Sequence, residues 1–206
     1  MTIRSFGPHI VSNASVDHPQ VDDLFADGRK AKIYYSDPPW GEGNTKYWAT
    51  MATKNTGQNI PSIGYETLIN RIMNLIKTHV SGQVFIETGL RWEEDTIQRM
   101  KAIGLSNIET ARLLYNGGGK KLENVIIFGS FDGSVGDLKR VAGMTGQKVA
   151  ELAVAPFAEP GAILFDGCCG MGYSAAAAIA HGMQFRGNEL NAVRLEKTIA
   201  RLEKAL

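Results

Sequence analysis

The sequence contains few cysteines, no long apolar run and no apolar leader at its amino terminus. Its two cysteines, Cys168 and Cys169, are adjacent, and neighbouring cysteines rarely bridge each other. This excludes the disulfide framework of small secreted proteins, and a reduced, cytoplasmic location is expected. No apolar stretch approaches the ~20 residues of a membrane span, and the first residues lack the core of a signal peptide. We therefore expect no contact with a membrane.

The sequence also lacks a strong net charge and a metal-ligand pattern. Lys and Arg total 22 against 21 Asp and Glu, which gives a net charge of +1. Contact with nucleic acid must then come from a local patch or a second subunit. The four histidines are scattered, so no metal site is predicted. With 206 residues, 44% of them hydrophobic, the chain suits one sizeable core. We expect residues 1–206 to form one domain.

Apolar patterning predicts alternating strands and helices. The predicted helices cover residues 17–26, 65–80, 93–103, 147–155, 174–181 and 192–206, and the predicted strands cover 9–12, 33–37, 84–88, 110–115, 124–129, 162–166 and 183–189. This alternation favours an α/β fold, a mostly parallel sheet with helices on both faces. The strands at 110–115 and 124–129 flank a glycine-rich segment, which predicts an antiparallel hairpin at one edge.

Two polar segments have alternative interpretations. Residues 41–60 are rich in Gly, Asn and Thr, which predicts a functional loop or lid. Their aromatic and lysine side chains could stack bases and meet phosphates, or the aromatics could fold back on the core. The hairpin tip, residues 116–121, carries two lysines that could touch a phosphate backbone. A solvated turn is the plainer interpretation.

The first candidate site is the stretch Ile33–Trp40. A buried strand ends in Asp37-Pro38-Pro39-Trp40, and two consecutive prolines cannot continue a sheet ladder because they lack N–H groups. Asp37 is therefore predicted at a rigid turn on the carboxyl edge of the sheet, where open α/β sheets bind ligands. A carboxylate, the Pro38 carbonyl and the flat Trp40 ring suit a planar amino group. A turn with only a structural role is the alternative.

The second candidate site begins at a strand that ends in Asp166. The strand runs directly into a glycine-rich turn, which a helix follows. This glycine turn consists of Gly167, Cys168, Cys169, Gly170, Met171 and Gly172. Such glycines allow a ligand to approach the backbone, and an acidic residue about 20 positions later, Glu189, suits ribose hydroxyls. The turn does not spell the dinucleotide fingerprint. Asp166 instead favours a ligand with an ammonium and a sulfonium group, such as S-adenosylmethionine. A strand–helix crossover with only a structural role is the alternative.

Together the two sites resemble the S-adenosylmethionine-dependent methyltransferases that modify the amino group of adenine or cytosine. That family carries a motif of Asp, Asn or Ser followed by Pro-Pro-aromatic, and a glycine-rich cofactor motif. The order of the two motifs here is similar to its circularly permuted class β. The resemblance implies a Rossmann-like methyltransferase fold and N6-methylation of adenine in DNA. The base would be flipped out of the duplex or come from a single strand.

The resemblance also implies residue roles. Asp37 and the Pro38 carbonyl would accept the two amino hydrogens, Pro39 would fix the turn and Trp40 would stack on the base. The cofactor would lie against Asp37 and against residues in and around the glycine turn. These residues are Asp166, Gly167, Cys168, Cys169, Gly170, Gly172, Glu189 and Asn191. Gln147 and Lys148 would meet its carboxylate.

The sequence departs from the family in two places. Cys168 stands where the family usually has Phe, so the apolar contact with the cofactor is smaller. Only residues 131–146 stand where class β enzymes insert a target-recognition domain, so specificity must come from loops or a partner. We expect a homodimer or a specificity partner. The alternatives are a cytosine-N4, RNA or protein-amide methyltransferase, or a silent partner subunit that binds nucleic acid or cofactor.

Overall fold

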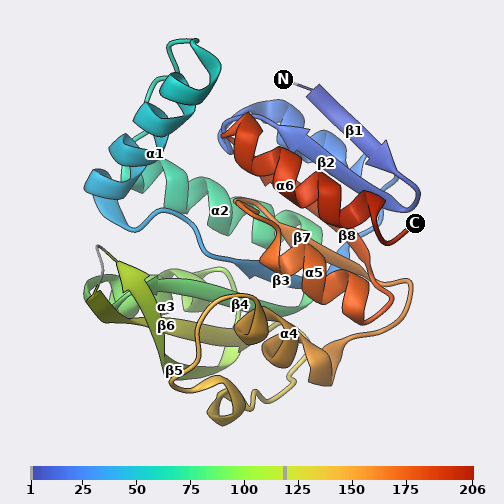
Figure 1. Cartoon of the computed structure of the whole chain (residues 1–206). Coiled ribbons are helices and arrows are strands. Elements are labelled where there is room, and N and C mark those ends of the chain that lie inside the picture. Colours follow the sequence, from blue (N-terminus) through green and yellow to red (C-terminus); the bar gives the residue numbers. More distant parts are fainter. Residues whose placement is uncertain (1, 118–119) are drawn as a thin grey trace.

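The computed structural model describes residues 2–117 and 120–206 as one eight-stranded sheet with helices on both faces (Figure 1). The strands are β1 (Thr2–Phe6), β2 (His9–Asn13), β3 (Ala31–Ser36), β4 (Val80–Gly89), β5 (Ser106–Gly117), β6 (Lys120–Ser130), β7 (Ile163–Asp166) and β8 (Gln184–Glu189). The α-helices are α1 (Gly41–Thr56), α2 (Tyr65–His79), α3 (Glu93–Ala102), α4 (Gln147–Val154), α5 (Tyr173–Ala180) and α6 (Ala192–Glu203). Short 3-10 segments include η1 (Pro19–Phe25) and η3 (Leu138–Val141).

The strand order is β1-β2-β8-β7-β3-β4-β6-β5. The five strands from β2 to β4 run parallel, whereas β1 pairs antiparallel with β2 and the hairpin β5–β6 pairs antiparallel with β4. The predicted mostly parallel sheet with an antiparallel edge hairpin is confirmed. Because parallel strands end at the same edge, the loops after β3, β7 and β8 meet there.

Apolar side chains cover both faces of the sheet. On one face, α4, α5 and α6 bury an alanine- and valine-rich surface against residues such as Phe85 and Phe185. On the other face, the stripe of α2 packs with η1 and α3; its members are Leu68, Ile69, Ile72, Met73, Leu75 and Ile76. The predicted amphipathic helix over residues 65–80 is confirmed.

The prediction of a structureless loop over residues 41–60 is wrong, because residues 41–56 form α1. The helix has no large apolar stripe. Its buried positions are Gly41, Thr45, Ala49 and Ala52, which recur at helical spacing but carry small side chains. Small residues let the helix pack closely, yet they give a weak apolar signal. Gly57 ends the helix in the left-handed conformation.

Smaller departures concern the ends of elements. The predicted helix over residues 17–26 is the 3-10 segment η1, and the described boundaries of the hairpin strands extend beyond the prediction. Helix α4 begins after Gly146, which is its N-cap residue and provides no side-chain hydrogen bond. Residues 118–119 of the predicted basic hairpin tip lie outside the described residues, so its phosphate contact stays a prediction.

No helix in residues 2–117 and 120–206 combines the length and the apolar character needed to cross a membrane.

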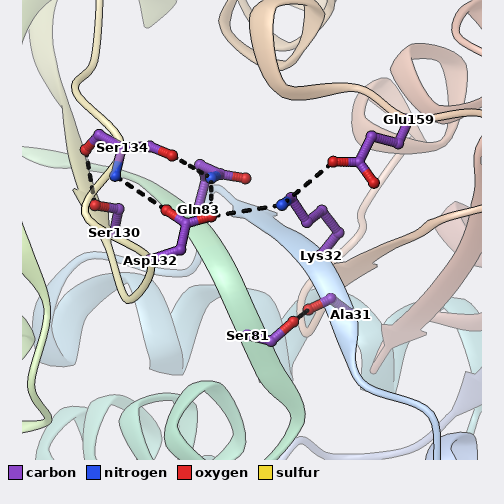
Figure 2. Close-up of polar contacts among 8 residues, drawn as sticks. All are labelled: Ala31, Lys32, Ser81, Gln83, Ser130, Asp132, Ser134 and Glu159. Atoms are coloured by element: carbon purple, nitrogen blue, oxygen red, sulfur yellow. Dashed lines mark hydrogen bonds and ion pairs between the residues drawn. The ribbon is translucent and has the colours of Figure 1, made fainter.

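A polar cluster fixes the sheet at the edge opposite the loops after β3 and β7 (Figure 2). Gln83 Nε2 donates to Asp132 Oδ2 at 2.8 Å and to Ser134 Oγ at 3.0 Å. Lys32 Nζ lies 3.5 Å from Asp132 and 3.3 Å from a carboxylate oxygen of Glu159. These contacts join the segments after β6 and α4 to the beginnings of β3 and β4. We therefore assign this cluster a structural role.

Asn188 connects three segments beneath the carboxyl edge of the sheet. Its Oδ1 accepts from Ser12 Oγ at 2.7 Å, and its Nδ2 donates to the carbonyls of Ala14 and Gly167, both at 3.2 Å. The side chain is 1% exposed, so water cannot replace these partners.

We predict that Asn188→Ala lowers the free energy of unfolding by about 1–3 kcal/mol, because buried polar groups lose their partners. Urea unfolding followed by circular dichroism measures the loss. Gln98→Ala, on the exposed face of α3, should leave the transition within about 0.5 kcal/mol of wild type. Equal stability of the two variants would contradict a structural role for Asn188.

Candidate functional site

Four carboxylates lie at the carboxyl edge of four neighbouring strands. Glu189 ends β8, Asp166 ends β7, Asp37 directly follows β3, and Glu87 lies near the end of β4. The parallel register aligns these ends, with Asp166 opposite Gly187 and Ser36 opposite Ile86. The sheet thus brings together residues that are distant in the sequence, such as Asp37 and Glu189, which are 152 positions apart.

A cavity of about 570 Å³ opens above this edge. Its walls include the Asp37–Trp40 turn, the start of the glycine turn at Gly167 and Cys168, and Glu189. Helix α1 supplies another wall with Asn44, Thr45, Tyr47, Trp48 and Ala49. The two predicted sites therefore share one cavity, and α1 lies beside it.

The Asp37 side chain is exposed to the cavity, yet the pKa of its carboxyl group is raised. Its carboxylate is open to the cavity, and its Oδ1 accepts from Trp40 Nε1 at 3.0 Å. Loss of bulk water in this concave setting and the charge of Glu87 raise the pKa of Asp37 well above its usual range, against the Trp40 hydrogen bond. The second oxygen, Oδ2, stays available to a donor in the cavity.

The Trp40 ring packs against a second aromatic side chain, Tyr115, whose place in the site was not predicted from the sequence. Its ring meets Tyr115, at the end of β5, in an edge-to-face arrangement with centroids 5.3 Å apart. A Cβ at Gly89 would lie 3.1 Å from the Trp40 ring, and one at Gly41 would lie 2.6 Å from Trp92. Glycine at both positions lets the indoles approach the backbone. Tyr115 also lines the cavity and had no distinguishing signal in the sequence.

Asp166 holds the glycine turn from within the core. Its Oδ1 accepts from the Cys168 N–H at 2.9 Å, and its Oδ2 accepts from Ser174 Oγ at 2.5 Å. Burial raises the pKa of Asp166 to about 6, although both hydrogen bonds favour the charged form. Asp166 itself is 4% exposed and does not line the cavity.

Glu189 holds the other side of the same turn. Its Oε2 accepts from the Gly170 N–H at 2.7 Å, and its Oε1 accepts from the Asn191 N–H at 2.8 Å. Burial raises the pKa of Glu189, while the Asn191 hydrogen bond and the Arg194 charge lower it. Asn191 in turn caps α6 through its Oδ1, which accepts from the Val193 and Arg194 N–H groups.

Gly170 and Gly172 have φ values of +52° and +80°, where other residues are strained. A Cβ at Gly172 would also lie 3.0 Å from the Thr198 Cα. Both positions therefore require glycine. In the same turn, Cys169 is 4% exposed and packs into the core below. Both cysteines are free, and burial raises the pKa of each thiol well above its usual range, so they stay protonated.

Arg194 of α6 reaches the cavity, although the mixture of basic and acidic residues along this helix is more typical of a solvated face. Its guanidinium lies 4.1 Å from the centroid of Trp48, and its Nη2 lies 2.6 Å from the position of a Cβ at Gly170. Its buried Nε has no partner among the described residues. A hydrogen bond of 3.2 Å from Asn55 to Asn191 further joins α1 to α6. Helix spacing alone did not reveal that α1 would cover this end of α6.

Gln147 and Lys148 lie at the start of α4, apart from the cavity-lining residues. Gln147 donates to Glu151 and accepts from Arg201 Nη1 at 2.7 Å, while Lys148 lies 3.6 Å from Glu151. Arg201 also donates to the Met171 carbonyl at 2.9 Å. Arg201 therefore links Gln147 to the glycine turn, and the ion pair of Lys148 is with Glu151 of the same helix.

Within the described ranges, no three His, Cys, Asp or Glu side chains gather in a way that could hold a metal ion.

The sequence matches no protein-family model and no curated protein. Solved structures nevertheless share the fold. M1.HpyAVI in complex with SAM superposes with a TM-score of 0.67 at 13% identity, covering 93% of this chain and 98% of that chain.

Two further structures agree. TTHA0409 of Thermus thermophilus, described as a putative DNA modification methylase and complexed with S-adenosyl-L-methionine, gives a TM-score of 0.62 at 14% identity over 96% of this chain and 94% of that chain. The cytosine-N4-specific PvuII DNA methyltransferase gives 0.64 at 10% identity over 95% and 89%. The predicted methyltransferase-like α/β fold is confirmed.

Proposed function

We propose that the chain transfers a methyl group from S-adenosyl-L-methionine to the N6 amino group of adenine in DNA. The observation that carries this proposal is that the Asp37–Trp40 turn and the glycine turn line one cavity. The fold shared with M1.HpyAVI and TTHA0409, both solved with that cofactor, supports it. We further propose that residues 1–206 act as one catalytic domain.

The residues around the glycine turn fit this cofactor. The glycine turn reaches the cavity at Gly167 and Cys168, and Glu189 presents carboxylate oxygens that ribose hydroxyls can reach. S-adenosyl-L-methionine, when bound, supplies the methyl group on a positively charged sulfur. The carboxylates of Asp37 and Glu189, which line the cavity, suit such a cation, and the buried Asp166 keeps the turn in shape.

The Asp37–Trp40 turn suits an acceptor amino group. Asp37 Oδ1 is held by Trp40, so Oδ2 is free to accept one amino hydrogen while the Pro38 carbonyl accepts the other. Both acceptors orient the nitrogen lone pair, and positioning with electrostatics contributes most of such a transfer. Trp40 and Tyr115 provide flat surfaces for a base, which must leave the duplex or come from a single strand.

The choice of adenine rests on Asp37, because an aspartate at the first position of this motif favours adenine over cytosine in the family that the chain resembles. The PvuII enzyme is cytosine-N4-specific and has the same fold, so cytosine is the alternative acceptor. With a net charge of +1, we propose that a second copy or a specificity partner completes the contact with DNA.

We predict that Asp37→Ala lowers methyl transfer from labelled cofactor to double-stranded DNA at least about 100-fold, because the amino hydrogens lose an acceptor. The product is identified as N6-methyladenine by mass spectrometry. Single-stranded DNA and RNA serve as parallel acceptors, and Asp23→Ala, an exposed carboxylate on η1, should keep wild-type activity.

The outcome separates the alternatives. Label in cytosine or in RNA alone would replace the adenine assignment. Cofactor binding in calorimetry with no transfer to any polymer would contradict an active methyltransferase and favour a silent partner subunit.

We predict that Asp166→Asn weakens cofactor binding about tenfold or more and removes the part of the pH dependence of stability that Asp166 causes. Because the folded protein binds the Asp166 proton more tightly than the unfolded chain, wild type loses stability as pH rises from about 4 to about 6. The neutral amide avoids this loss, so unfolding free energies should shift in its favour by up to about 3 kcal/mol over that range. Urea titrations at several pH values test the sign.

A further inference from the structure

Beyond the residues assigned above, Glu87 lies next to Asp37 at the carboxyl edge. Their strands are adjacent and parallel, with Tyr35 opposite Phe85 and Ser36 opposite Ile86. The next step along each strand brings Asp37 beside Glu87. Parallel strands lie about 4.8 Å apart, so two carboxylates are placed within a short distance of each other. Mutual repulsion then favours a proton on one of them.

The two carboxylates have different partners. Glu87 Oε1 accepts from the Tyr35 hydroxyl at 2.5 Å, and its Oε2 accepts from Asn124 Nδ2 at 3.0 Å. Burial raises the pKa of Glu87, but both oxygens act as acceptors, as in the charged form, and these two hydrogen bonds work against that rise. Asp37 accepts only from Trp40 among the described side chains. Environments that separate the proton affinities of two neighbouring acids also separate their roles.

We propose that Glu87 is a positioning residue for the methyl transfer, held as a carboxylate by Tyr35 and Asn124, whose negative charge favours proton uptake by Asp37. The inference rests on the proposed function. The amino nitrogen bonds to the methyl carbon as the carbon–sulfur bond breaks, and that bond's electron pair stays on sulfur. The nitrogen then loses one proton to Asp37, and Glu87 touches none of the reacting atoms.

The other charged groups around Asp37 do not replace Glu87. Asp166, from β7, also raises the pKa of Asp37, but by less than Glu87 does. Arg194, from α6, lowers it. Cys168 faces the same edge as a protonated thiol, and burial with the Glu87 charge keeps the Tyr35 phenol protonated. Glu87 is therefore the neighbouring charge with the largest effect on Asp37.

The test measures the Asp37 carboxyl directly. Its ¹³C resonance, identified by its absence in Asp37→Asn, is followed against pH in ligand-free wild type, Glu87→Gln and Glu87→Asp. We expect a wild-type midpoint well above the ordinary value of about 3.9 and a decrease of about one unit or more in Glu87→Gln. Glu87→Asp, which keeps the charge, should restore most of the shift.

Activity gives the second measurement. Under single-turnover conditions, the acidic limb of the rate against pH should move to lower pH in Glu87→Gln, because Asp37 loses its proton more readily. The maximum rate should fall about tenfold, because Asp37 is then a weaker base. Glu94→Gln, on the exposed face of α3, removes an unrelated carboxylate and should change neither quantity.

An Asp37 midpoint equal in wild type and Glu87→Gln would overturn the inference, even with methyl transfer intact. If Glu87→Gln does not fold, the wild-type and Tyr35→Phe titrations decide the question. An ordinary Asp37 midpoint in wild type would overturn the inference, whereas a raised wild-type midpoint that is lost in Tyr35→Phe would support it. A shifted midpoint without methyl transfer to any acceptor would instead overturn the proposed function.

Discussion

The structure depends on the alignment of parallel strand ends, which gathers four carboxylates at one edge of the sheet. Asp37, Glu87, Asp166 and Glu189 each belong to a different strand or its end, and the parallel register places those strand ends together. Bringing like charges into a partly dehydrated edge is unfavourable, so burial raises the pKa of all four. The remaining features of the site reduce this cost or exploit it.

The hydrogen-bond donors show how the cost is reduced. Asp166 and Glu189 accept backbone N–H groups of the glycine turn, and these contacts give the turn its shape. A cationic ligand would relieve the remaining repulsion, so ligand affinity and loss of stability have the same origin. Such a balance is common where a binding site is built from groups that the folded protein alone does not stabilise.

Helix α1 adds a cover that joins the two halves of the site. It follows the Asp37–Trp40 turn directly, and its Trp48 and Asn55 contact Arg194 and Asn191 on and before α6. The helix thereby links the proposed acceptor turn to the part of the chain that we propose for the cofactor. Its small buried residues permit this close approach.

The sequence by itself determined the local chemistry. The strand before two prolines placed Asp37 at a sheet edge, and the turn at residues 167–172 required glycines between a strand and a helix, because backbone preferences act over a few residues. Only the tertiary structure decided which distant residues meet. Helix α1, the entry of Arg194 into the cavity and the pairing of Glu87 with Tyr35 all depend on packing between remote segments, which no local pattern of polarity encodes.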